Sequence, residues 1–195
     1  MLIYRTANRN PGEFEDAGGF LPKNYRSKGQ IKTEFMEWCR TGKVVKMVER
    51  HQSSALGSGY IISMDMTKLC GGYSKKFFYE LNVSGLRRIP FTADVLGVKQ
   101  LSWKGIQQKP ENVHLYMSAT KLKYAEIFAI SNIGDRKKEL SVFSWVPFKY
   151  FSNYAKNKAG PYKPIKNRKE YPKPVRGSIN DRAKIFGKTV SRTHK

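Results

Sequence analysis

The sequence has few acidic residues for its length. Its 195 residues include 15 Asp and Glu against 37 Lys and Arg, which gives a formal net charge of +22 at pH 7. A surface of this charge attracts polyanions and acidic proteins and speeds encounter with them, but it does not determine the fold. The charge alone therefore favours nucleic acid as a partner.

Cysteine is also scarce, since Cys39 and Cys70 are the only two in the chain. They form no CxxC pair and have no histidine at metal-ligand spacing, so we expect no structural zinc site. Reduced thiols are the simplest interpretation, although one disulfide stays open. No apolar run approaches the roughly 18 residues that span a bilayer. The first residues lack the apolar segment of a signal peptide, which favours a cytosolic protein or a domain of a larger secreted one.

Apolar residues are nevertheless frequent enough for a core, at 39% of the chain, and one domain accounts for the length. Helical signals occur after Pro11 and again in a longer segment that has Thr33 as its cap and ends at Thr41-Gly42. Short runs rich in Val, Ile, Phe and Tyr predict strands between them. The pattern predicts an α+β domain over residues 1–150. The predicted strands cover residues 2–5, 43–51, 59–66, 77–83, 89–97, 121–133 and 140–147.

Residues 151–195 differ from the rest of the chain. They are rich in Lys and Arg, lack an apolar period, and are interrupted by prolines at 161, 164, 172 and 174. Such a composition is typical of an extended or loosely docked segment. We therefore expect a basic tail here, which offers phosphate contacts to a nucleic acid.

The first predicted strand carries an unusual charge. Arg5 lies at the end of an apolar run, where a guanidinium needs a paired anion or a phosphate. An arginine on an edge strand that reaches water is the alternative. A polar turn, a short helix that begins near Pro11 and a stop at Gly18-Gly19 follow.

Three later segments carry polar residues in strand-like or turn surroundings. His51 ends the run 47–51, Ser63 lies in a strand that opens with Gly59-Tyr60, and Glu126 begins the β-rich run 126–133. Each has an ordinary alternative when taken alone, such as a surface histidine in a turn or a structural serine in a strand. Their common order along the chain is the more informative observation.

Arg5, His51, Ser63 and Glu126 occur in the order found in the A subunits of cholera toxin and heat-labile enterotoxin, which this chain resembles over residues 2–146. Those proteins are NAD-dependent mono-ADP-ribosyltransferases, a class of glycosyltransferase. The resemblance implies an ADP-ribosyltransferase-like fold, with two packed, mainly antiparallel sheets around an NAD cleft and a few short helices. It also implies that NAD is a substrate and that no metal is required.

The resemblance assigns a role to each of these residues. Glu126 would be the catalytic carboxylate that stabilises positive charge on the ribose of NAD, and Ser63 would position it. Arg5 would hold the pyrophosphate, for which a bidentate guanidinium suits better than a lysine. His51, Tyr60 and Ser63 would line the NAD site.

The acceptor is less closely defined. Tyr124 replaces the first glutamate of the family's Glu-x-Glu pair, and a glutamate there accompanies arginine acceptors, so we do not expect an arginine acceptor. The segment from Gly97 to Glu126 is longer than in the enterotoxins and falls at the family's target-recognition loop. Besides Tyr124, it offers Trp103, His114 and Tyr116 as acceptor contacts, with a core role as the alternative.

The resemblance further implies a toxin effector domain, such as the C-terminal domain of a Tc- or Rhs-type toxin. Such a domain is secreted or injected, acts in the target-cell cytoplasm, and has a delivery or immunity partner. A host-cell protein, actin or another acidic cytosolic protein, is the favoured acceptor because the basic surface suits it. Transfer to RNA or DNA stays open, as does a non-catalytic basic RNA-binding protein, which composition alone would favour.

Overall fold

The structure of the chain is a computed structural model, and it describes residues 1–25, 27–53, 59–68, 75–102, 113–131, 138–157 and 160–165. It is an α+β fold with antiparallel strands and a few helices, which confirms the predicted class. Among the described residues, none of the helices has the length and apolar character that crossing a bilayer requires. The α-helices are α1 (Pro11–Asp16), α2 (Lys28–Arg40), α3 (Lys43–Ser53) and α4 (Ala93–Leu96).

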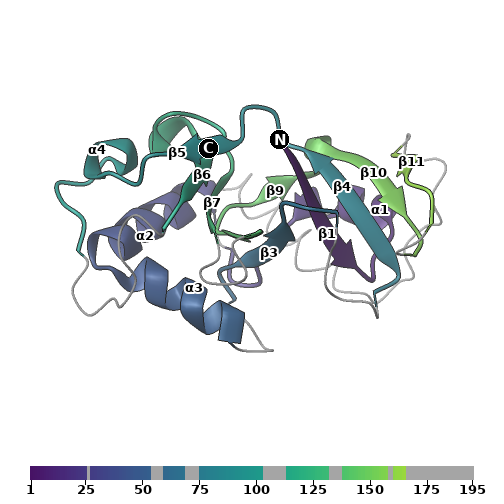
Figure 1. The fold of residues 1–195 in the computed structure, drawn as a ribbon, viewed down its shortest axis with the longest axis horizontal. Helices are drawn as coiled ribbons and strands as arrows, with labels where there is room; N and C mark the ends of the chain where they lie inside the picture. The colour runs from purple at the N-terminus through teal and green to yellow at the C-terminus, as the bar shows by residue number, and fades with distance from the viewer. Residues whose placement is uncertain are drawn as a thin grey trace, which may run out of the picture.

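A large antiparallel sheet runs through the described part of the molecule, with the strand order β11-β10-β4-β1-β3-β8-β7-β6-β5 (Figure 1). A smaller two-stranded sheet pairs β2 (Gly19–Phe20) with β9 (Val146–Pro147). The large sheet consists of β1 (Leu2–Ala7), β3 (Ile62–Asp65), β4 (Phe77–Asn82), β5 (Arg87–Ile89), β6 (Leu115–Met117), β7 (Phe128–Ser131), β8 (Glu139–Val142), β10 (Phe151–Ala155) and β11 (Lys163–Pro164).

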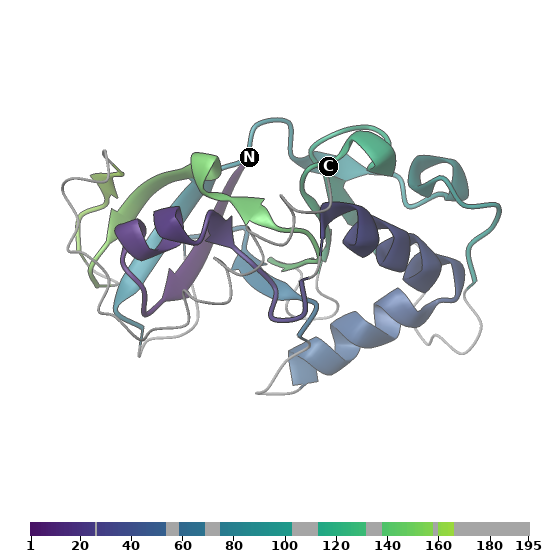
Figure 2. The ribbon, with the colours of Figure 1, turned by 180° about the vertical axis from the view of Figure 1, so that it is seen from behind.

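The large sheet has two halves that meet between β1 and β3. β1 pairs with β4 along its whole length, but with β3 only where Tyr4 faces Asp65. The first half consists of β1, β4, β10 and β11 and lies with α1. The second half consists of β3, β8, β7, β6 and β5 and lies with α2, α3 and α4 (Figures 1 and 2). The resemblance implied two sheets packed on each other around a cleft. In the part of the chain that the structure describes, nine of the strands form one large sheet with a narrow junction, and the second sheet has only two strands.

One hydrophobic cluster takes residues from both halves. Ile3 and Leu81 come from the first half, and Met64 and Val142 come from the second. The two halves therefore bury apolar side chains against a shared interior, and this burial is the main favourable contribution to their association.

Local signals determine the first helix and its end. Asn10 caps α1, because its side chain accepts a hydrogen bond from Glu13 N at 3.0 Å while Glu13 Oε2 accepts one from Asn10 N at 2.8 Å. Gly19 follows in the left-handed region, with φ of +127°. A Cβ on Gly19 would lie 2.0 Å from the carbonyl oxygen of Val146, so only glycine allows β2 to approach β9.

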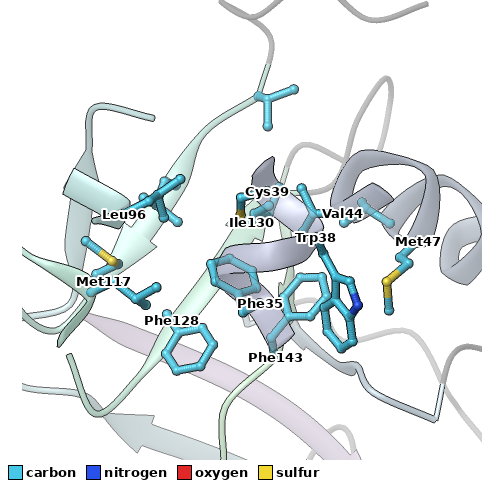
Figure 3. Packing of buried hydrophobic residues seen from close by; sticks show 14 of the residues in the cluster. Phe35, Trp38, Cys39, Val44, Met47, Leu96, Met117, Phe128, Ile130 and Phe143 are labelled. Carbon is cyan, nitrogen blue, oxygen red and sulfur yellow. The ribbon is translucent and has the colours of Figure 1, made fainter. Parts of the chain in front are cut away.

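The second half has its own core under α2 and α3 (Figure 3). α2 ends at Thr41, as predicted, but its N-cap is Ser27 and not Thr33. Residues 43–51 were predicted as a strand and instead form α3. Val44 and Val48 favour a strand locally, yet their spacing also places them on one face of a helix. Both are buried in the cluster that contains Phe143, so packing outweighs local propensity.

Residues 89–97 were also predicted as a strand, and this prediction is wrong beyond Ile89. The strand β5 ends there, and α4 follows with Thr92 as its N-cap. Gly97 ends α4 in the left-handed conformation, with φ of +73°. The other predicted strands all overlap strands of the structure.

The large sheet continues past the domain boundary that we predicted at residue 150. β10 pairs with the central strand β4, and its end residues Phe151 and Ala155 are buried. These residues belong to the sheet, whereas we predicted residues 151–195 as a basic tail that is extended or loosely docked. β11 adds a short edge strand, and Pro164 is tolerated there because an edge strand has one unpaired side. Residues 166–195 lie outside the described residues.

Candidate active site

Arg5 lies at the junction between β1 and β3. Its Nη1 donates a hydrogen bond to the carbonyl oxygen of Ser63, and its guanidinium lies 5.1 Å from the ring centroid of Phe20. Its Nε is buried and has no hydrogen-bond partner among the described residues. Burial lowers the pKa of Arg5 to about 10, although the nearby charge of Asp65 acts in the opposite direction. The side chain therefore carries its positive charge at neutral pH.

A pocket of about 410 Å³ opens beside Arg5. Its volume falls within the range of roughly 300–1,000 Å³ that is usual for small-molecule sites. Arg9, Lys23 and Lys75 also line it, and no acidic side chain occurs among its described lining residues. A pocket with four cationic side chains and no carboxylate fits an anionic ligand.

His51 and Ser63 form a pair next to Arg5. His51 Nε2 and Ser63 Oγ lie 2.6 Å apart and share a hydrogen bond. Burial, followed by the positive charge of Arg5, lowers the pKa of His51 below its usual value of 6.5. The imidazole is therefore neutral at neutral pH. The structure thus brings together three residues that the sequence placed in one site: Arg5, His51 and Ser63.

Glu126 lies between a 3-10 helix (η2, Leu122–Tyr124) and β7. Its backbone N–H donates to Ser118 Oγ at 2.9 Å, which holds the chain at this point. Its side-chain Oε2 accepts a hydrogen bond from Tyr150 OH at 2.6 Å and forms an ion pair with Lys149 Nζ at 2.7 Å. We predicted that Ser63 would position this carboxylate. In the structure, the hydroxyl of Ser63 shares its hydrogen bond with His51.

Lys149 and Tyr150 lie on a second 3-10 helix (η4, Phe148–Tyr150) that leads into β10. No sequence motif marks them, because the resemblance ends just before this helix at residue 146. Their contacts with Glu126 form because the fold brings η4 next to this residue, and the sequence does not indicate this proximity.

The ionisation of Glu126 reflects these neighbours. Burial raises the pKa of its carboxyl, but the hydrogen bonds from Lys149 and Tyr150 and the charges of Lys149 and Lys28 together outweigh burial. The net result is a pKa below the usual value of 4.5. Glu126 is therefore a carboxylate at neutral pH, as the proposed chemistry requires.

A second pocket, of about 180 Å³, opens at Glu126. Tyr25 lines this pocket and also lines the pocket beside Arg5. Burial raises the pKa of Tyr25 to about 12, so its hydroxyl stays protonated. Tyr25 is thus a lining residue that the two pockets share.

The remaining predicted site residues lie in different surroundings. Tyr60 packs edge-on against Trp38, with ring centroids 5.1 Å apart, in the cluster under α2 and α3. Tyr116 lies on β6 and packs against the cluster that both halves share. Tyr124 is 69% exposed and lines the pocket of Glu126. Trp103 lies outside the described residues.

The described residues contain no group of three or more His, Cys, Asp or Glu side chains that could hold a metal ion. A comparison with models of protein families finds no match, and a search of curated proteins finds none either. The function of the chain is therefore inferred from its motifs and from the two pockets that share Tyr25.

Proposed function

We propose that this chain is an NAD-dependent mono-ADP-ribosyltransferase. One observation carries the proposal: Arg5 and Glu126 are far apart in the sequence, yet they line pockets that share Tyr25. An arginine for a pyrophosphate and an ionised carboxylate for a ribose are the two charges that cleavage of NAD requires.

The larger pocket suits the donor side of the reaction. Arg5 keeps donors beyond the one that bonds to Ser63, and these are available to the pyrophosphate of NAD. Arg9 and Lys23 also line this pocket and add positive charge to it. Tyr25 lines this pocket as well as the Glu126 pocket, and its protonated hydroxyl can donate a hydrogen bond.

Glu126 supplies the opposite charge where the bond breaks. The bond from the ribose C1 to nicotinamide breaks, and nicotinamide leaves with the electron pair. The acceptor atom forms the new bond to C1, and its proton passes to Glu126 or to water. Positive charge builds on the ribose during this exchange, and a fixed carboxylate in a partly buried pocket stabilises it. As the resemblance implies, we place this activity in a toxin effector domain that acts in the cytoplasm of a target cell.

The proposal is tested by adding NAD to the purified chain and recording its melting temperature. NAD at about 100 times its Kd stabilises the folded state by about 2.7 kcal/mol, which corresponds to a rise of about 5–10 °C for a chain of this size. Release of nicotinamide from labelled NAD is measured in parallel. A chain that shows neither effect is not an ADP-ribosyltransferase, and a plain RNA-binding protein should show neither.

Tyr150→Phe provides a pH-dependent prediction. The variant loses the hydrogen bond that lowers the pKa of Glu126, so this pKa rises. Activity that needs the carboxylate disappears as the pH falls through this pKa, so the acid limb of the kcat profile moves to higher pH. The measurement is nicotinamide release as a function of pH, with Tyr154→Phe on β10 as the matched control. An unchanged acid limb in Tyr150→Phe would show that this tyrosine does not tune Glu126.

A further inference from the structure

Two lysines lie on aromatic rings that line the Glu126 pocket. Lys28 Nζ lies 4.2 Å from the ring centroid of Trp145, and Lys123 Nζ lies 4.7 Å from that of Tyr124. Lys32 Nζ donates a hydrogen bond to the carbonyl oxygen of Lys123 at 2.9 Å, which joins α2 to η2. We call these five residues, Lys28, Lys32, Lys123, Tyr124 and Trp145, the lysine–aromatic rim.

The charge of the rim limits the acceptor. Glu126 is the only acid among the described residues that line the pocket, and Lys149 already pairs with it. A guanidinium or an ammonium that approached as acceptor would meet like charge from Lys28 and Lys32. An anionic acceptor would be attracted by both.

The exposed ring of Tyr124 distinguishes between two kinds of anionic partner. Only three large hydrophobic side chains are exposed among the described residues, and Tyr124 is by far the most exposed of them, at 69%. The carboxylates of an acidic protein surface could pair with the lysines, but they offer no flat group that stacks on this ring. A nucleobase has a flat face that stacks on a tyrosine, while its phosphates reach the neighbouring lysines.

We propose that the acceptor of this enzyme is a single-stranded nucleic acid, with bases against Tyr124 and backbone phosphates at Lys28 and Lys32. The single strand follows from the exposed ring of Tyr124, because a base that is stacked and paired inside a duplex has no free face to place on it. For its chemistry, the inference rests on the proposed function. In that reaction, a nitrogen or oxygen atom of the nucleotide forms the bond to the ribose C1 and loses its proton, while nicotinamide leaves with the electron pair. The binding part does not depend on NAD.

The binding part is tested with the full chain and labelled oligonucleotides of about 16 nucleotides, as RNA, as DNA and as duplex. The double variant Lys28→Gln/Lys32→Gln removes two phosphate contacts. The slope of log K against the logarithm of the salt concentration should therefore become less steep by about 1.4 for a single strand, and the affinity should fall by about tenfold. Tyr124→Ala should also cost about tenfold, and Tyr124→Phe should retain binding because it keeps the ring.

The matched control is Lys43→Gln/Lys46→Gln, which removes the same charge from exposed positions on α3. Residues 151–195 are identical in all variants, so their contribution to binding cancels. Equal losses in the rim variant and in the α3 control would overturn the inference, because they would show that only net charge matters. Preference for the duplex would overturn it as well.

The transfer part uses labelled NAD with either the single-stranded oligonucleotide or actin as the acidic protein. We expect label on the oligonucleotide, and we expect the rim variant to transfer less label per nicotinamide released. Label on actin and none on the oligonucleotide would overturn the inference and leave the proposed function intact. If NAD is neither bound nor cleaved while the oligonucleotide still binds at the rim, the proposed function fails, and the acceptor role fails with it.

Discussion

Replacing Glu126 with glutamine is expected to lower nicotinamide release and ADP-ribosyl transfer by about a thousandfold, which corresponds to about 4 kcal/mol of transition-state stabilisation. Glutamine has the shape of glutamate and can still accept a hydrogen bond from Tyr150, but it carries no charge. The positive charge that develops on the ribose then has no opposite charge in the pocket. The measurement is the single-turnover rate with labelled NAD.

The control for this variant is Glu37→Gln, which removes one carboxylate from an exposed position on α2. It should retain the wild-type rate. Far-ultraviolet circular dichroism and the melting temperature establish that both variants are folded. A Glu126→Gln protein that cleaves NAD at nearly the wild-type rate would show that Glu126 is not the catalytic carboxylate.

Arg5→Lys should have the second largest effect, a loss of about a hundredfold in kcat/KM for NAD, most of it in KM. Lysine preserves the positive charge near Asp65, so the electrostatic environment of the junction changes little. It cannot provide the planar fork that holds a pyrophosphate with two parallel hydrogen bonds. The measurement is a steady-state titration with NAD.

Arg87→Lys on β5 is the matched control, because this arginine is exposed and does not line either pocket among the described residues. Arg5→Lys also loses the hydrogen bond to the carbonyl of Ser63, so its melting temperature is recorded with the kinetics. An unchanged KM in a folded Arg5→Lys protein would rule out Arg5 as the pyrophosphate ligand.

The contrast between α1 and α3 shows which parts of the fold the sequence could predict. α1 follows from its own residues, since the capping pair Asn10 and Glu13 and the glycines after it act locally. α3 does not, because Val44 and Val48 fit a strand as well as a helical face. Burial against the core under α2 decides between the two, and that core includes residues distant in sequence such as Phe143.

The same division applies to the site. Arg5, Ser63 and Glu126 are chemically distinctive residues in recognisable surroundings, so the sequence identified them as candidates. No motif in the sequence marks Tyr25 or Tyr150. They reach the site because the fold brings the loop of Tyr25 and the 3-10 helix of Tyr150 close to Glu126. Tyr60 is a motif position that packs against Trp38, and its contact with NAD stays a prediction.

The narrow junction between β1 and β3 makes the site a joint product of both halves of the sheet. Arg5 belongs to the first half and bonds to Ser63 of the second, whereas Glu126 belongs to the second and bonds to Tyr150, which leads into the first. Each of the two key charges is thus held by a partner across the boundary. Neither half alone contains both Arg5 with its partner Ser63 and Glu126 with its partner Tyr150, so loss of docking between the halves would break both contacts. The proposed activity should therefore depend on how the halves are assembled as well as on how each is folded.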